Sequence, residues 1–372
     1  EVATHVATMA TQGWRAVNAE RGLAMYGCSG NGNPISCLGS LARAGTKAYG
    51  EGWELLAGAK LRILREFSFK TFFWMRSSAD GRFIGNGASS STGAMISDLQ
   101  RDKDIPVHAS YDPGFFPDNS GFMFQSTPIG AGFCGTNLLT SNPREINFGE
   151  AQCSSATNVG LYQHLASGLG GADHYAINGQ FTSDNGGDGP DEEPIADFGS
   201  DSTIKLTALA YDGNHYVEKT PVTTDSPFEG DNVLSPSSRL VISRLAGPNN
   251  KQLGYVVRKI NVSATSLSTT EVGRYCVKGA KPAISFDERY AVLHHYVEEG
   301  DFAELGFASA SDAGFQALLD AGSANIYVLD LVTGVKTRVT NMKPGQFALF
   351  PHFRSDNWFY FLVRDSKSGK EY

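Results

Sequence analysis

The sequence is poor in charged residues, which make up only 19% of its 372 residues. Coiled coils and helical repeats need abundant Glu, Lys and Arg, so this scarcity excludes both classes. No apolar run approaches the roughly 18 residues that a membrane-spanning helix requires, so we expect no transmembrane segment. The 39 acidic residues outnumber the 31 basic ones. Because nucleic-acid-binding proteins present a basic surface, we expect no nucleic-acid partner.

Local signatures of catalysis are also missing. The chain contains no Gly-x-Ser-x-Gly nucleophile elbow, His-Glu-x-x-His zinc motif, Walker phosphate loop or Cys-x-x-Cys-His haem motif. The run from Gly130 to Gly135 fits Gly-x-Gly-x-x-Gly, but no convincing helix follows it, so we interpret it as a turn. We therefore predict no catalytic residue and no organic cofactor, and we favour a non-enzyme.

Glycine and aromatic residues are abundant, with 42 Gly, 23 Phe and 14 Tyr, so the chain can bury a large core. Residues 1–60 have helix-compatible spacing and form a separate, partly helical N-terminal segment in our prediction. From residue 61 to 372, short β-prone runs bounded by turn residues predict an all-β fold. These runs span 62–67, 82–87, 121–125, 204–211, 239–245, 253–260, 290–297, 325–331 and 358–363.

A turn motif recurs along the β-rich part of the chain. Ser or a similar residue precedes an Asp, whose side chain can bond nearby backbone amides in a tight hairpin. The copies centre on Asp80, Asp118, Asp184, Asp287 and Asp356, with an Asp-less copy at Ser235–Arg239. Six copies predict a propeller of six four-stranded blades with long loop insertions. We also expect a short helix within residues 150–180.

Two stretches resemble a known repeat. The run Asn325-Ile-Tyr-Val-Leu-Asp330-Leu, with Thr-Gly334 and Arg338-Val-Thr340, resembles the I-Y-V-x-D-L, T-G and R-L-T parts of the TolB-type, WD40-like (PD40) propeller repeat. The segment from Tyr111 to Phe124 resembles its other half, P-x-F-S-P-D-G-x-x-I-x-F. Met95-Ile-Ser-Asp98-Leu matches more loosely. The resemblance implies a radial β-propeller, mostly non-catalytic binding roles, and a periplasmic or secreted protein of the bacterial cell envelope.

The last predicted blade lacks strands at the end of the sequence. We expect residues around 61–67 to supply strands to it and close the ring, with some truncation of the chain. The alternative is a native chain that continues beyond Tyr372.

Five cysteines indicate an oxidising compartment. Cys28 and Cys37 form one close pair in loop-like sequence, and Cys134 and Cys153 form another. We predict two local disulfides, which leaves Cys276 free. The alternative is five reduced thiols.

The strongest local signal is a cluster of acidic residues. Residues 145–204 contain ten Asp and Glu and no Lys or Arg, so the rest of the chain sums to +2 against a total of −8. Gly and Pro in this insertion allow oxygen ligands to converge on a hard cation such as Ca²⁺. The candidate calcium ligands are Asp184, Asn185, Asp188, Asp191, Glu192 and Glu193. The alternative is a solvated acidic loop, because like charges repel.

These observations leave two hypotheses. The first is a secreted or periplasmic, non-catalytic propeller that binds a protein or cell-envelope partner and is stabilised by calcium or disulfides. The second is a metal-dependent hydrolase or lyase, or a metal-binding protein, with His and Asp at the channel mouth. His108 and His352 occupy similar repeat positions that can converge on the channel. His294 and His295 are adjacent on a predicted strand, so they should face opposite sides.

Overall fold

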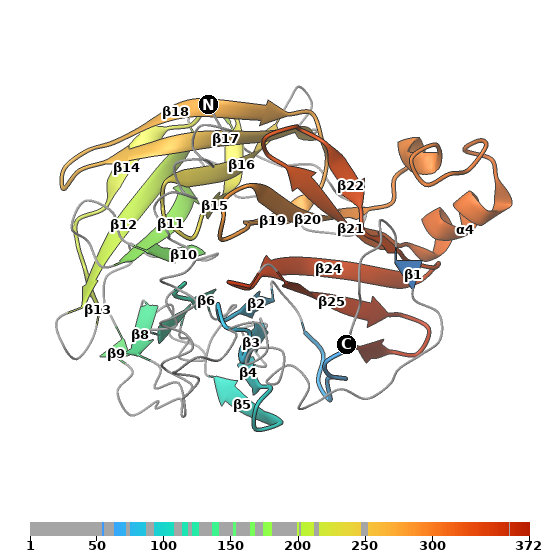
Figure 1. Cartoon of the computed structure of the whole chain (residues 1–372), viewed down its shortest axis with the longest axis horizontal. Helices are drawn as coiled ribbons and strands as arrows, with labels where there is room; N and C mark the ends of the chain where they lie inside the picture. The colour runs from blue at the N-terminus through green and yellow to red at the C-terminus, as the bar shows by residue number, and fades with distance from the viewer. Residues whose placement is uncertain are drawn as a thin grey trace.

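The computed structural model describes residues 54–55, 63–71, 75–86, 93–107, 114–117, 121–125, 136–140, 152–153, 164–167, 174–180, 199–200, 202–211, 216–246, 252–356 and 358–372. Among them, no helix is long and apolar enough to cross a membrane. Antiparallel strands that follow one another in sequence make up most of this part of the chain (Figure 1).

The first two sheets each contain four strands in sequence order. The first sheet consists of β2 (Arg76–Ser77), β3 (Phe83–Asn86), β4 (Ala94–Asp98) and β5 (Lys103–Val107). The second consists of β6 (Gly114–Phe115), β7 (Gly121–Gln125), β8 (Thr136–Thr140) and β9 (Gln152–Cys153).

The third sheet has five strands, because two short strands share the edge of β12. Its strands are β10 (His164–Ser167), β11 (His174–Gln180), β12 (Thr203–Tyr211), β13 (Tyr216–Glu218) and β14 (Val222–Asp225). The fourth sheet has the longest strands. They are β15 (Glu229–Leu234), β16 (Leu240–Ala246), β17 (Gln252–Val262) and β18 (Leu267–Tyr275).

The last sheet joins two units through one parallel pair, Ala324 with Phe347. One unit comprises β19 (Ala280–Ile284), β20 (Tyr290–Tyr296), β21 (Ala324–Asp330) and β22 (Lys336–Arg338). The other comprises β24 (Gln346–Phe353), β25 (Phe359–Asp365) and β26 (Lys370–Glu371). In addition, β1 (Glu54–Leu55) pairs with β23 (Thr340–Asn341).

The first strands of successive units contact one another in a closed order. The series runs β2, β6, β10, β15, β19 and β24, and β24 contacts β2 again. Antiparallel units arranged radially around their first strands make a β-propeller, so the predicted all-β propeller is confirmed. The blade count of six stays a prediction, as does the boundary between residues 1–60 and 61–372.

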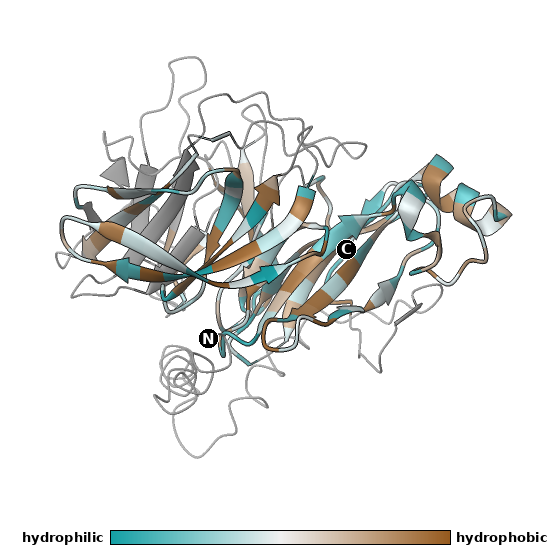
Figure 2. Cartoon of the chain, turned by 90° about the horizontal axis from the view of Figure 1, so that it is seen from above, coloured by the Kyte–Doolittle hydropathy of each residue, from teal (hydrophilic) through white to brown (hydrophobic). Residues whose placement is uncertain are grey.

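Alternating apolar side chains hold neighbouring sheets together, and Figure 2 shows bands of opposite hydropathy along the strands. Val257 of β17 packs with Ile284 of β19 and Leu293 of β20 in one buried cluster, together with Tyr327 of β21. Burial of such side chains contributes roughly 1.5–3 kcal/mol each, so these contacts dominate the stability of the ring.

Residues 63–71 contact the last unit of the ring. The backbone N–H of Phe67 donates to the carbonyl oxygen of Glu371 in β26 at 2.9 Å. The Glu371 carboxylate accepts bonds from the backbone N–H and the hydroxyl of Thr71, each at 2.7 Å. Phe67 and Thr71 thus bring this segment into contact with the last blade. The predicted strand at 62–67 is wrong for residues 63–67, which make only this isolated backbone pairing.

The predicted turn motif forms the same hydrogen bonds in two sheets. Ser78 donates its hydroxyl to Asp80 at 2.6 Å, and Ser285 donates to Asp287 at 2.6 Å. The residue after each Asp has a positive φ, 75° at Gly81 and 57° at Glu288. A Cβ at Gly81 would lie 2.7 Å from Arg354, so glycine is required there by space as well as by conformation.

In the Asp-less copy of the turn motif, Glu288 of the next unit supplies the carboxylate. Ser237 stands at the Asp position of the turn between β15 and β16, and its hydroxyl donates to the buried Glu288. The backbone N–H of Ser237 also donates to Glu288 at 3.3 Å. Glu288 therefore completes a turn whose own sequence lacks the acidic residue.

The third sheet corrects two predictions. The predicted copy at Asp184 falls in the sequence between β11 and β12, not between β10 and β11, and it lies outside the described residues. The short helix expected within 150–180 is also wrong for the described residues, because 164–167 and 174–180 pair as strands.

An unpredicted insertion joins β20 to β21. It contains η3 (Glu299–Phe302) and α4 (Ala313–Ala321), and α4 projects away from the sheets at the right of Figure 1. Asp312 caps α4 by accepting from the backbone N–H of Gly314 at 2.8 Å. Phe315 is buried and packs against Phe302 and Phe307, so the insertion has a small core of its own.

Candidate functional site

The strand order gives each sheet two distinct ends. Turns between first and second strands and between third and fourth strands lie at one end, which we call the turn end. Connections from second to third strands and links between sheets lie at the other, which we call the insertion end. The acidic run after β11 joins second and third strands, and its flanking residues Gln180 and Thr203 pair with each other. It therefore leaves from the same end as the α4 insertion.

Most of the predicted site residues lie outside the described part of the chain. This applies to all six candidate calcium ligands, and to Cys28, Cys37, Cys134 and His108. Cys153 belongs to β9, and Cys276 is an exposed free thiol. The calcium site and the two disulfides therefore stay predictions.

The turn end of the channel encloses a small cavity of about 50 Å³. Its walls are the ends of first strands and the turns that follow them. They include Phe115, Phe116, Pro236, Phe286 and Phe353, with Arg76, Ser77 and His352 as the polar contributors. The cavity is far smaller than a typical ligand pocket, which has several hundred Å³, so it fits water rather than a substrate.

A Ser–His contact lies in this cavity. The Ser77 hydroxyl lies 3.1 Å from Nδ1 of His352, the distance expected of a nucleophile and its base. Burial, and then the charge of Arg76, lower the pKa of His352 to about 3. A base with so low a pKa takes a proton poorly at neutral pH. Among the described residues no carboxylate orients the ring, so the contact is structural.

A charged cluster lies at the insertion end of the channel. Asp231 of β15 accepts from Arg244 at 2.7 Å and lies 3.6 Å from the ammonium group of Lys281. Burial raises the pKa of Asp231, but the charges of Lys281 and Arg244 outweigh it and lower the pKa to about 2. Burial and the same two cations hold the pKa of His294 well below its usual value.

These charges do not suit a metal ion. A cationic side chain stands beside both His294 and His352. Such cations repel a metal as they repel a proton. Within the described residues, no group of three or more His, Cys, Asp or Glu side chains converges.

The adjacent histidines of β20 face opposite sides, as the strand pattern predicts. Nδ1 of His294 accepts from the backbone N–H of Phe350 in β24 at 3.3 Å. His295 points instead to the insertion, where its Nε2 lies 2.8 Å from Oδ2 of Asp301. Because a carboxylate only accepts, Nε2 carries the proton in this contact.

A second, larger hollow of about 660 Å³ lies on this side of β20. The link between β18 and β19 forms one wall, the η3 region forms another, and β22 forms the third. The lining residues are Cys276, Val277, Lys278, His295, Asp301, Glu304, Lys336, Thr337 and Arg338. Its size is that of a small-molecule binding site.

The hollow contains both signs of charge. Lys336 pairs with Glu304 at 3.3 Å, and its ammonium lies 4.1 Å from the centre of the Tyr327 ring. Burial raises the pKa of Asp301, but the hydrogen bond and charge of His295 more than offset it, so the pKa lies below its usual value. Asp301 is therefore ionised at neutral pH and accepts from the backbone N–H of Glu298 at 2.9 Å.

Sequence reasoning did not find this hollow. Its residues come from three separate segments, and no spacing relates Lys278, Asp301 and Arg338. The one available signal was Cys276, the odd cysteine left after the two predicted pairs.

No protein-family model matches the chain, and no curated protein matches it in sequence. Solved structures of β-propellers are similar to it at low identity. TolB from Acinetobacter baumannii shares 10% identity with a TM-score of 0.43, over 75% of this chain and 56% of TolB. The chain thus spans little more than half the length of that TolB structure.

Two further solved structures are similar. Hydrazine synthase from Kuenenia stuttgartiensis has 9% identity and a TM-score of 0.42, over 84% of this chain and 78% of its own. The Cps50 (Swd1) β-propeller domain from Myceliophteria thermophila has 10% identity and a TM-score of 0.39, over 80% and 81% of the two chains. TolB-type and WD40-like propellers, which the sequence motifs resemble, are thus among the structural neighbours.

Proposed function

We propose that the protein is a secreted or periplasmic, non-catalytic propeller that binds a protein or cell-envelope partner through its insertion end. The α4 insertion carries the proposal. Residues 297–323 contain six Asp and Glu and no Lys or Arg, and they fold around Phe315 outside the sheets. A folded, acidic projection with a small core of its own is suited to contact a basic surface of a partner.

The acidic run of 145–204 adds to this argument. Together the two segments hold sixteen acidic and no basic residues, so the remainder of the chain sums to +8 against a total of −8. The negative charge of the protein thus belongs to two segments, each containing a connection that leaves from the insertion end.

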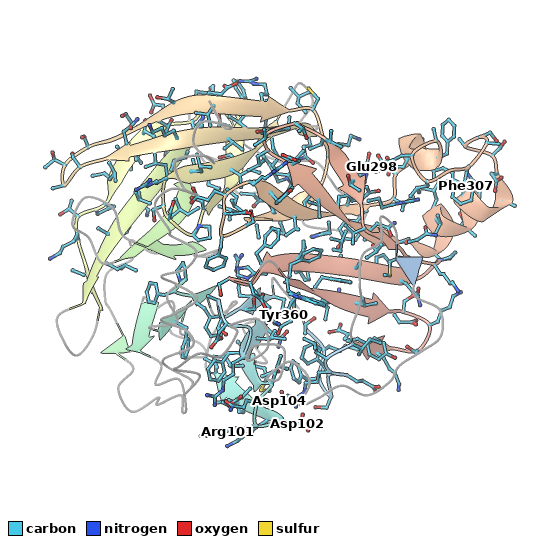
Figure 3. The ribbon with its side chains drawn as sticks, viewed as in Figure 1. Arg101, Asp102, Asp104, Glu298, Phe307 and Tyr360 are labelled. Atoms are coloured by element: carbon cyan, nitrogen blue, oxygen red, sulfur yellow. The ribbon has the colours of Figure 1, made fainter. Side chains whose placement is uncertain are left out.

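A matched pair of charge reversals tests the proposal. Asp320 is exposed on α4, whereas Asp102 is exposed in the turn between β4 and β5, at the turn end. Figure 3 shows Asp102 at the edge opposite the α4 insertion, which carries Phe307. Asp320→Lys should abolish crosslinking of proteins from a cell-envelope fraction that wild type and Asp102→Lys both capture. Identical capture by all three proteins would contradict the proposal.

Calcium and disulfides are part of the same proposal. Calcium bound by the acidic insertion should make the melting temperature fall when EDTA is added, because a ligand stabilises the state that binds it. An unchanged melting curve, with no metal found by elemental analysis, would exclude it. For the disulfides, only Cys276 should react with an alkylating agent in the denatured, non-reduced protein, and five alkylated thiols would contradict the pairing.

A further inference from the structure

The guanidinium group of Arg338 is the cation of the hollow that has no ion-pair partner among the described residues. Lys278 pairs with Glu298, and Lys336 pairs with Glu304. The Arg338 guanidinium forms no ion pair or hydrogen bond with any described residue, and its Nη1 is enclosed without an acceptor. A partly desolvated guanidinium strongly favours an anionic partner, because carboxylate or phosphate oxygens match its planar donors.

The opposite wall offers acceptors. Asp301 is 16% exposed and Glu304 is 42% exposed, so carboxylate oxygens face the hollow. His295 is 2% exposed and holds Asp301 in place through Nε2, which makes it a positioning residue. Carboxylate acceptors of this kind bind hydroxyl or N–H donors of a ligand.

The three walls together define the chemistry of a ligand. Lys278, Lys336 and Arg338 bring three positive charges to the lining, and Asp301 and Glu304 bring two negative ones. Because Glu298 and Glu304 already pair with Lys278 and Lys336, Arg338 is the lining cation left for a ligand, which should therefore carry a negative charge. The hollow of about 660 Å³ is open to solvent and leaves room for a small molecule such as one sugar unit.

We propose that this hollow binds a small polyhydroxylated carboxylic acid, such as a sugar acid. Its carboxylate contacts Arg338, and its hydroxyl groups donate to Asp301 and Glu304. The site lies beside the outer strand β22 and is separate from the channel. It does not depend on the partner-binding role of α4, because its ligand-facing groups belong to the base of the insertion and to the sheets.

The free thiol of Cys276 allows a direct test. Cys276 lines the hollow and is exposed, so a ligand that fills the hollow should slow its alkylation. The probe is D-galacturonate, and the rate is followed by mass spectrometry of the peptide that contains Cys276. We expect saturable protection of the wild-type protein by D-galacturonate, and none by neutral D-galactose or by sodium chloride at equal ionic strength.

Two arginine variants make the test specific. Arg338→Gln should weaken protection at least about tenfold, because it removes a charge-assisted contact. Arg289→Gln removes a guanidinium from the turn before β20, where Arg289 pairs with Asp330 outside the hollow, and should leave protection unchanged. Melting curves of both variants establish that they are folded, and Lys278→Gln provides a second lining variant, expected to weaken protection.

Three results would overturn the proposal. They are absence of protection of the wild-type protein at any galacturonate concentration, equal protection by galactose, and unchanged protection in both Arg338→Gln and Lys278→Gln. If Asp320→Lys did not change the crosslinking of envelope proteins while galacturonate still protected Cys276, the partner proposal would be rejected and the proposal for the hollow would be retained.

Discussion

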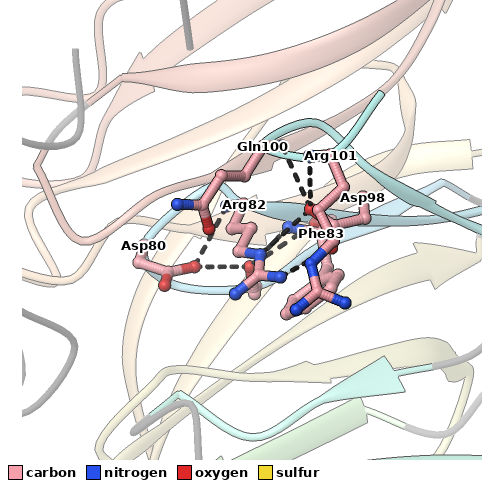
Figure 4. A network of polar contacts seen from close by, with 7 residues as sticks. Asp80, Arg82, Phe83, Asp98, Gln100 and Arg101 are labelled. Atoms are coloured by element: carbon pink, nitrogen blue, oxygen red, sulfur yellow. Dashed lines mark hydrogen bonds and ion pairs between the residues drawn. The ribbon is translucent and has the colours of Figure 1, made fainter. Parts of the chain in front are cut away.

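The turn end of the channel and the hollow beside β22 use polar residues in opposite ways. At the turn end, Arg82 donates twice to Asp98, at 3.0 and 2.6 Å, and both side chains are almost fully buried (Figure 4). In the hollow, Asp301 and Glu304 are partly exposed, and Arg338 has no described partner. Saturated, buried groups stabilise a fold, whereas open groups are available to a ligand.

The largest effect should come from the buried ion pair. Asp98→Ala leaves the Arg82 guanidinium buried without this carboxylate, so the free energy of unfolding should fall by about 3–5 kcal/mol. Urea unfolding measures it. The control is Asp102→Asn, because Asp102 is 74% exposed and 3.7 Å from Arg65, and Asn tolerates its φ of 49°, so the change should cost less than about 1 kcal/mol. Equal losses would remove the distinction between buried and open groups.

A pH dependence comes next, from His352. Its pKa of about 3 in the folded protein lies below the ordinary value of 6.5, so the unfolded state binds the proton more readily. The stability that this group contributes is complete above pH 6.5 and is lost as the pH falls towards 3. Between pH 7 and 4.5 wild type should lose roughly 2–3 kcal/mol more than His352→Gln.

Asp80 titrates in the opposite direction. Burial raises its pKa to about 6, so its contribution is complete below 3.8 and is lost as the pH rises through 6. Because this contribution is common to wild type and His352→Gln, the difference between their urea midpoints isolates His352. Parallel pH profiles for the two proteins would show that His352 is not enclosed as described.

Removal of the Glu288 carboxylate should cause a smaller loss of stability. Glu288→Ala removes the acceptor for the hydroxyl and backbone N–H of Ser237, which should cost about 2 kcal/mol in thermal or urea unfolding. Glu288→Gln keeps one acceptor oxygen and should cost less. If both variants unfolded like wild type, the Asp-less turn would not depend on its neighbour.

The smallest effect should come from the hollow itself. Arg338→Gln breaks no ion pair with a described residue, so its free energy of unfolding should lie within about 0.5 kcal/mol of wild type. The same urea series measures it. A loss comparable with that of Asp98→Ala would mean that Arg338 stabilises the fold and is not free to bind a ligand.

Local patterns predicted the fold better than the site. The Ser–Asp turns at Asp80 and Asp287 and the apolar runs of β20 and β21 are set by neighbouring residues, so their sequences indicate them. The carboxylate of Glu288 reaches a turn 51 residues away, and no local rule assigns it to Ser237. Nor did periodicity indicate α4, although Asp312 as N-cap and Gly322 after its end were available signals.

The hollow was beyond sequence reasoning for the same physical reason. The charges of Lys278, Asp301 and Arg338 meet only in the folded ring, where β22 pairs with β21, β21 pairs with β20, and the link after β18 forms the facing wall. Tertiary placement of this kind depends on strand order and register, which a single sequence does not encode locally.

The most direct test of the account is a crystal structure of the protein with D-galacturonate. We predict difference density in the hollow, with the carboxylate beside Arg338 and hydroxyl groups beside Asp301, and no ligand in the channel cavity beside His352. An empty hollow at saturating D-galacturonate would contradict the assignment of binding to the hollow. Ligand density in the channel cavity would contradict the assignment of a purely stabilising role to the turn end.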